Sequence, residues 1–220
     1  MRRGERTEEE GRNSLRAVLS RLRGRLPDGA LGGKGETRLW LEESVLTSDV
    51  RAFHRSLEDD RHREALDLYR GPFLEHFHLR GMDAFNRWAD ERRTHYRREA
   101  HGAALTVGAQ AREAGELAEA ANAYRRALDL APLQEAGAAG LIRVLTARGE
   151  RGDAVRFYQA FTDRLAEELD LSPSSELEAL AEQIRSPANG VDGEEPAGEI
   201  LRGGRTEMEH GPGGAAPDGF

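Results

Sequence analysis

The feature that most constrains the fold is a spacing of 34 residues that recurs in the second half of the chain. The same residue type stands at both ends of this spacing in three places: Gly115 and Gly149, Ala120 and Ala154, Tyr124 and Tyr158. A repeat of this length is one helix–turn–helix unit, which cannot bury its apolar face alone and therefore stacks on its neighbours. We expect two such units, over residues 101–134 and 135–168. Stacks of this kind form surfaces for partners more often than active sites.

Small and aromatic residues at the repeated positions indicate how the paired helices pack. Ala120 and Ala154 stand where two backbones approach closely, so that only a small side chain fits. Tyr124 and Tyr158 follow one helical turn later and fill the wider gap. Replacing Ala120 by a larger residue should therefore overpack the pair.

Glycine and proline mark the ends of the predicted helices. Gly115 and Gly149 end the first helix of each pair, where a positive φ costs glycine least. Pro132 is expected to start the next helix, where its missing N–H matters least. Together these positions predict an all-α fold of stacked helical hairpins, similar to tetratricopeptide (TPR) repeats.

The composition is typical of a soluble helical protein. The chain has 38% apolar and 33% charged residues, a formal net charge of −8 and no cysteine, which excludes disulfides. No apolar run approaches the roughly 20 residues that span a bilayer, and the start lacks the apolar stretch of a secretory signal. We expect a cytoplasmic protein with no membrane partner.

We predict no enzyme activity, cofactor or metal site. The segment Gly32-Gly33-Lys34-Gly35 lacks the residue order of a phosphate-binding Walker loop. His76 and His78 are two residues apart, which is a poor spacing for two ligands on one helical face. No nucleophile–base constellation stands out either.

The first forty residues are locally basic. Residues 1–11 form a charged lead that we expect to be disordered, and 12–26 carry an apolar stripe at helical spacing. Glycines followed by alternating residues predict a small β-hairpin over 31–41. Between Gly11 and Leu41 there are seven Arg/Lys residues and two acids, a local balance that favours docking on phosphates.

From Ser48 onward the sequence predicts mainly helices. Thr47, Ser48 and Asp49 offer N-cap oxygens for a first helix, and residues 64–69 repeat the small-then-aromatic spacing as a degenerate third copy. Further predicted elements are a break at 71–72, a long helix from near 83 and a last helix over 174–184. The composition of 187–220, rich in glycine, proline and acids, predicts a disordered tail.

With these elements in order, the chain resembles the SARP-type bacterial transcriptional activators, which join a winged helix-turn-helix to a helical bacterial transcriptional activator domain. The matching segments are residues 13–23 (NSLRAVLSRLR) and 65–74 (ALDLYRGPFL), then Trp88 with Glu91-Arg92, residues 127–132 from Ala127 to Pro132 (ALDLAP) with Glu135, and 167–169 with Pro173. The likeness covers residues 12–186. It implies a partial winged-helix remnant over 12–43 and an activator domain over 44–186.

The resemblance implies a mode of DNA binding. Residues 12–26 look like the recognition helix and 31–41 like the wing. The residues that would face the major groove or its edges are Asn13, Arg16, Ala17, Ser20 and Arg23. Arg21 and Arg25 would lie toward phosphate, with Lys34 and Arg38 near the minor groove.

The same resemblance implies several partners. The winged domain would bind promoter DNA, and the helical domain would bind RNA polymerase or another protein and a second copy in a homodimer. A complete winged domain has a sheet and two helices before its recognition helix, whereas residues 1–11 are short and polar. We therefore expect an N-terminally truncated form, either a fragment or a shortened protein that has lost DNA binding. The alternative function is a TPR-like scaffold that binds a protein or a small signal and no DNA.

Overall fold

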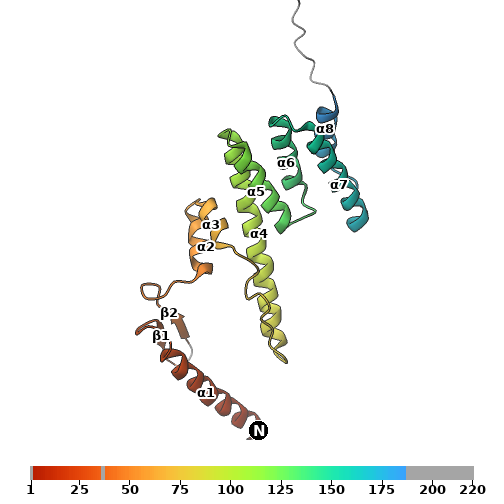
Figure 1. Cartoon of the computed structure of the whole chain (residues 1–220). Helices are drawn as coiled ribbons and strands as arrows, with labels where there is room; N and C mark the ends of the chain where they lie inside the picture. Colours follow the sequence, from red (N-terminus) through yellow and green to blue (C-terminus); the bar gives the residue numbers. More distant parts are fainter. Residues whose placement is uncertain (1, 36–37, 187–220) are drawn as a thin grey trace, which may run out of the picture. The chain divides into compact units, whose positions relative to one another are not determined.

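The structure is a computed structural model that describes residues 2–35 and 38–186. In this part of the chain eight helices and one two-stranded hairpin follow one another (Figure 1). Their bounds are α1 (Arg2–Arg23), β1 (Leu31–Lys34), β2 (Arg38–Leu41), α2 (Asp49–Glu58), α3 (His62–Leu68), α4 (Asp83–Glu113), α5 (Leu117–Leu130), α6 (Glu135–Ala147), α7 (Arg151–Leu169) and α8 (Ser175–Arg185). The tail at 187–220, for which we predicted disorder, lies outside the described residues.

Helix α1 is longer at its start than the sequence analysis predicted. It begins at Arg2, so residues 2–11 are helical and do not form the disordered lead that we expected. Arg and Glu, which dominate this segment, have high intrinsic helix propensity. At the other end α1 stops at Arg23 rather than at Leu26, although the Leu26 N–H still donates to the Leu22 carbonyl at 3.1 Å.

The predicted hairpin is confirmed. Strands β1 and β2 pair antiparallel with Leu31 opposite Leu41 and Lys34 opposite Arg38, and Gly35 at the bend has φ +64°. The Trp40 ring lies over Gly32, where a Cβ would come within 2.9 Å of Trp40 Cζ2 and closer to two other ring atoms. Glycine at position 32 therefore makes room for the indole.

Helices α2 and α3 form a first helical hairpin that packs on α4. Of the three predicted cap residues, Ser48 is the N-cap of α2, and its Oγ accepts from the Arg51 N–H at 3.3 Å. Arg126 of α5 donates to the carbonyls of Leu66 and Tyr69 at 2.7 and 2.6 Å, which satisfies the end of α3.

A loop connects α3 to α4 and is held by Arg93 of α4. The Arg93 guanidinium donates to the carbonyls of Phe73 at 2.8 Å, Leu74 at 2.7 Å and Phe77 at 3.0 Å. Two residues of this loop, Leu74 and His76, have positive φ values of +49° and +61°. The planar guanidinium thus supplies hydrogen-bond donors to three loop carbonyls that are not part of a helix or strand.

Helices α4 to α7 form the two predicted repeats, stacked in sequence order (Figure 1). Gly115 and Gly149 both have φ +78°, as the spacing predicted. In each case the glycine and the following glutamate donate to carbonyls of the preceding helix: Gly115 to Arg112, Glu116 to Ala111, Gly149 to Thr146 and Glu150 to Leu145. This is the Schellman pattern of helix termination, and it is the same in both repeats.

The prediction for Pro132 was wrong. Helix α6 begins at Glu135, three residues later, with Gln134 as its N-cap. Pro132 follows Ala131 in a turn that the Gln134 N–H closes on the Ala131 carbonyl at 3.1 Å. Proline suits this position because its fixed φ matches the second residue of a turn.

The core of the stack is built on small residues. Ala120, Ala127 and Ala154 have no exposed surface, and Tyr124 and Tyr158 are buried. The Tyr124 ring lies between Gly108 of α4 and Gly140 of α6, and the lack of a Cβ on both glycines leaves space for it. Alanine and tyrosine at the repeated positions therefore pack as the sequence predicted.

Helix α8 covers the end of the stack. Its N-cap is Ser174, and it packs on α6 and α7 through four buried residues: Leu177, Leu180, Ala181 and Ile184. Arg151 of α7 donates to the Ile184 carbonyl at 3.1 Å and so satisfies the last turn of α8. Among the described helices, none combines the length and apolar character needed to span a bilayer.

Candidate nucleic-acid interface

The polar face of α1 carries three of the predicted DNA-binding residues. Asn13, Ala17 and Ser20 lie three or four positions apart, which places them on one side of the helix. All three are exposed. A polar face with a small residue at its centre is compatible with close approach to base edges.

One flank of α1 forms a basic cleft with the hairpin. The cleft has a volume of about 640 Å³ and is lined by Arg12, Leu15, Arg16, Leu19, Arg23, Gly33, Gly35, Arg38 and Leu39. Four arginines from two separate elements therefore line one concave surface. Arginine presents five donors in a planar fork and is suited to bind phosphate oxygens.

Some of these side chains have defined local contacts. Arg16 Nη1 donates to Asn13 Oδ1 at 3.4 Å, and Arg21 Nε donates to the Ala17 carbonyl at 3.3 Å. These contacts link residues one turn apart on α1. The guanidinium of Arg21 is thereby directed along the helix, on the flank away from the cleft.

The bend of the hairpin has positive charge on both sides. Lys34 and Arg38 are directly opposite each other in the register, and both are exposed. Like charges on facing strand positions repel. A bound anion near the bend would reduce this repulsion, so the pair favours a negatively charged partner.

The structure thus brings some predicted residues together and leaves others apart. Arg16, Arg23 and Arg38 line the cleft, and Lys34 lies across the hairpin from Arg38. Arg12 also lines the cleft and was not predicted, although its spacing from Arg16 and Arg23 places it on the same flank of α1. Asn13, Ala17, Ser20 and Arg21 lie on other faces of α1, and Arg25 follows the end of the helix.

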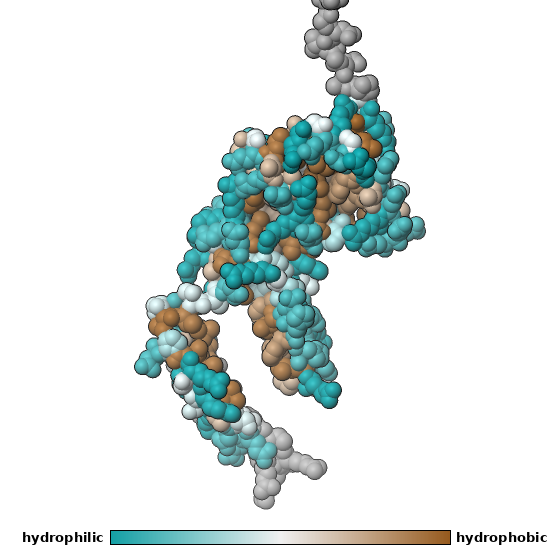
Figure 2. Space-filling model, viewed as in Figure 1, coloured by the Kyte–Doolittle hydropathy of each residue, from teal (hydrophilic) through white to brown (hydrophobic). Residues whose placement is uncertain are grey.

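The face of α1 opposite Asn13, Ala17 and Ser20 is apolar and exposed, and it borders the cleft at Leu15. Leu15, Val18 and Leu22 keep 53%, 51% and 39% of their surface accessible. Figure 2 shows apolar surface on this helix–hairpin segment, to which Leu39 and Trp40 also contribute. An apolar stripe of this kind normally packs against another element.

A second cluster of side chains was missed by the sequence analysis. His54 of α2 lies beside His95 and Glu99 of α4, and one ligand atom from each of the three lies within 4.8 Å of the others. The only local signal was the spacing of His95 and Glu99, which are four residues apart and hence on one helical face. His54 stands 41 positions before His95, so nothing local predicted the meeting.

By contrast, the histidines that we did consider for metal binding are not part of such a cluster. His76 is almost fully exposed and lies 3.8 Å from Glu75. His78 Nε2 lies 3.4 Å from Asn86 Nδ2. Neither belongs to the group that could hold an ion.

Stacked helical hairpins closed by a terminal helix define a TPR-like helical domain. A comparison with known protein families matches residues 42–185 to the bacterial transcriptional activator domain. The match covers more than half of the chain, and the protein therefore belongs to this family. This confirms the resemblance drawn from the sequence for the activator domain, and the family is one of transcription-regulator domains rather than of enzymes. No curated protein matches the chain significantly.

Proposed function

We propose that the protein is a DNA-binding transcriptional activator of the SARP type that acts in the cytoplasm on promoter DNA. The observation that carries this proposal is the cleft in which Arg12, Arg16 and Arg23 of α1 meet Arg38 of the hairpin. It directly precedes a domain of the bacterial transcriptional activator family. A positively charged concave surface also attracts phosphates although the whole chain is acidic.

In this mechanism α1 enters the major groove with its polar face. Asn13, Ala17 and Ser20 approach base edges, and Arg16 and Arg23 bind guanine or the flanking phosphates. Lys34 and Arg38 bring the hairpin to the adjacent minor groove. Arg21 and Arg25 contact the phosphate backbone and fix the register of the helix.

The helical domain supplies the contacts to proteins. In this proposal the stack of α2–α8 binds RNA polymerase or another protein, and it supports a homodimer that reads two copies of a short site. The exposed stripe of Leu15, Val18 and Leu22 is a surface on which another part of a winged domain could pack. In a complete winged domain such a stripe packs against a further element of the domain.

The same stripe favours a second candidate function. If the apolar face of α1 binds a protein segment, the chain acts as a scaffold without DNA binding. The two functions differ in the role of the arginine cleft, because only DNA binding requires the guanidinium groups of Arg16 and Arg23.

The decisive experiment measures binding of the protein to fluorescent duplex DNA from its own promoter region over a series of salt concentrations. The double variant R16A/R23A should weaken binding and flatten the salt dependence by about one unit for each lost phosphate contact. If either arginine reads a base, the preference for the specific site also falls, by about 1–3 kcal/mol.

A matched control is available in the helical domain. Arg125 donates to Asn122 at 3.4 Å, three residues away, with the same geometry as Arg16 and Asn13. The variant R125A/R164A removes the same charge from exposed helical positions and should bind DNA like the unmodified protein. Absence of any binding at low salt, both for this chain and for a form extended in frame upstream, would refute DNA binding and leave the scaffold function.

A further inference from the structure

The cluster of His54, His95 and Glu99 has the geometry of a metal centre. Glu99 Oε2 lies 3.7 Å from His54 Nδ1 and 3.4 Å from His95 Nε2. One carboxylate oxygen thus faces one nitrogen from each imidazole. Two elements contribute, because His54 belongs to α2 whereas His95 and Glu99 belong to α4.

The carboxylate oxygen at the centre of this cluster lacks a hydrogen-bond partner among the described residues. Glu99 Oε2 is buried, and none of its described neighbours donates a hydrogen bond to it with acceptable geometry. A buried acceptor that is left unsatisfied costs about 1–3 kcal/mol, and more when it is charged. A cation between Glu99 and the two imidazoles would satisfy this oxygen.

Aromatic rings hold the two imidazoles in place. The His54 ring centroid lies 5.3 Å from that of Tyr96 and 5.7 Å from that of Phe53, in edge-to-face arrangements. The His95 ring lies 5.4 Å from Tyr96. Ligands that packing already orients lose little freedom when a metal binds, which favours affinity.

The donor set and distances fit zinc. Zinc binds imidazole nitrogen at about 2.0–2.1 Å and carboxylate oxygen at about 2.0–2.2 Å, usually in a tetrahedron. The edge of such a tetrahedron is about 3.4 Å, close to the two separations measured from Glu99. Calcium and magnesium prefer sets composed of oxygen atoms. Three protein ligands leave a fourth position for water.

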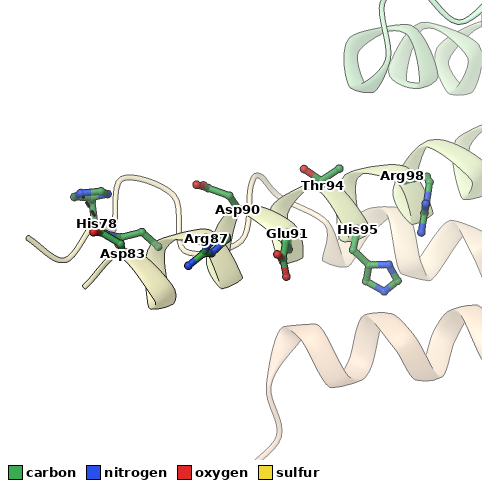
Figure 3. A pocket seen from close by; sticks show the side chains of 9 residues that line it. His78, Asp83, Arg87, Asp90, Glu91, Thr94, His95 and Arg98 are labelled. Carbon is green, nitrogen blue, oxygen red and sulfur yellow. Dashed lines mark hydrogen bonds between the residues drawn. The ribbon is translucent and has the colours of Figure 1, made fainter. Parts of the chain in front are cut away.

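The site is accessible from solvent. His95 also lines an open cleft with Glu91, Thr94 and Arg98 of the same helix. In Figure 3 the side chains of Glu91 and His95 extend from the same side of α4, whereas Asp90 and Thr94 point to the other side. Of the three ligands His95 lines this cleft, so its imidazole can be reached from solvent.

We propose that His54, His95 and Glu99 form a Zn²⁺ site that joins α2 to α4. The bound ion fixes the first helical hairpin to the long helix that carries the repeats. This inference does not depend on DNA binding, because its ligands lie entirely within the helical domain.

The test titrates the chelator-treated full chain with Zn²⁺ in a calorimeter. One equivalent should bind, and Zn²⁺ should raise the melting temperature because it binds the folded state only. The variant Glu99→Gln keeps the size of the side chain and removes the charged ligand. It should weaken binding by at least 10-fold, since loss of even an outer-shell partner costs about 10- to 100-fold, and it should abolish the thermal shift. His95→Ala should have the same effect.

Two control variants separate this site from other sources of zinc binding. Glu91→Gln removes the same charge from α4 about two turns before Glu99, and His76→Ala removes an exposed imidazole; both should bind like the unmodified protein. Each variant is compared with its own metal-free melting temperature, so a general loss of stability is recognised. Unchanged affinity in Glu99→Gln, or an equal loss in Glu91→Gln, would overturn the proposal.

Discussion

The close fit of Tyr124 between two glycines leads to a quantitative prediction about the variant Gly140→Ala. Gly140 lies in α6, where alanine would normally be the better helix former. A Cβ at this position would lie 2.5 Å from Tyr124 Cζ and closer still to Cδ1 and Cε1. Carbon atoms attract each other best at about 3.5–4.0 Å. The new methyl group therefore overlaps the ring.

The ring has little room to move away from this methyl group. On its other side Gly108 of α4 is so close that a Cβ there would lie 2.8 Å from Tyr124 Cε1. Overpacking of this kind costs about 1–3 kcal/mol, and the gain in helix propensity returns about 0.5–1 kcal/mol. We expect a net loss of about 1–2 kcal/mol in the free energy of unfolding, which lowers the melting temperature by roughly 2–8 °C.

The assay is urea or thermal unfolding followed by circular dichroism. Gly102→Ala is the matched control, because Gly102 also lies in a helix interior but a Cβ there would meet nothing within 4 Å. This control should be more stable by up to about 1 kcal/mol. In a Tyr124→Leu background, Gly140→Ala should lose most of its effect, since the ring is gone. Equal or greater stability of Gly140→Ala alone would refute the packing argument.

Three further variants test other parts of the structure. Ala120→Leu should destabilise by about 1–3 kcal/mol, whereas Ala118→Leu, at an exposed position of the same helix, should leave the melting temperature nearly unchanged. Arg93→Ala should destabilise by about 1–3 kcal/mol, because carbonyls of the loop before α4 lose their donor, and Arg93→Lys should not restore stability because a single ammonium cannot reproduce the fork; full rescue by lysine would contradict this role. Burial lowers the pKa of His101 below its ordinary value, so the unfolded chain binds the proton first and stability falls as the pH drops through about 6.5 and below. His101→Gln should lose less stability than the unmodified protein between about pH 7.5 and pH 5.5 in thermal unfolding, and identical pH profiles would contradict the assignment.

The repeats could be predicted because their determinants are local in the sequence. Gly115 and Gly149 end helices through their own backbone conformation, and Ala120 and Tyr124 act within a single turn. Pro132 was misplaced because a proline suits both the first turn of a helix and a preceding turn. Only the hydrogen bond that closes the turn before α6 distinguishes the two.

The parts of the candidate sites that could not be predicted depend on tertiary contacts between residues far apart in the sequence. The flank with Arg16 and Arg23 was evident from helical spacing, but its meeting with Arg38 depends on how the hairpin folds back toward α1. The cluster around Glu99 depends on how α2 packs on α4. No pattern in the sequence near His54 could show that contact, since α3 and the loops on either side of it separate the two helices in the chain.

The identical Schellman turns at Gly115 and Gly149 have a consequence for how this stack can change in length. Both units end their first helix with the same turn, and each helix packs mainly on its sequence neighbours. Duplication of one whole unit would therefore lengthen the stack with the same kinds of contact that it already contains. The buried face of α8 closes the far end. An additional unit would therefore have to be inserted before α8, which would still cover the last unit of the stack.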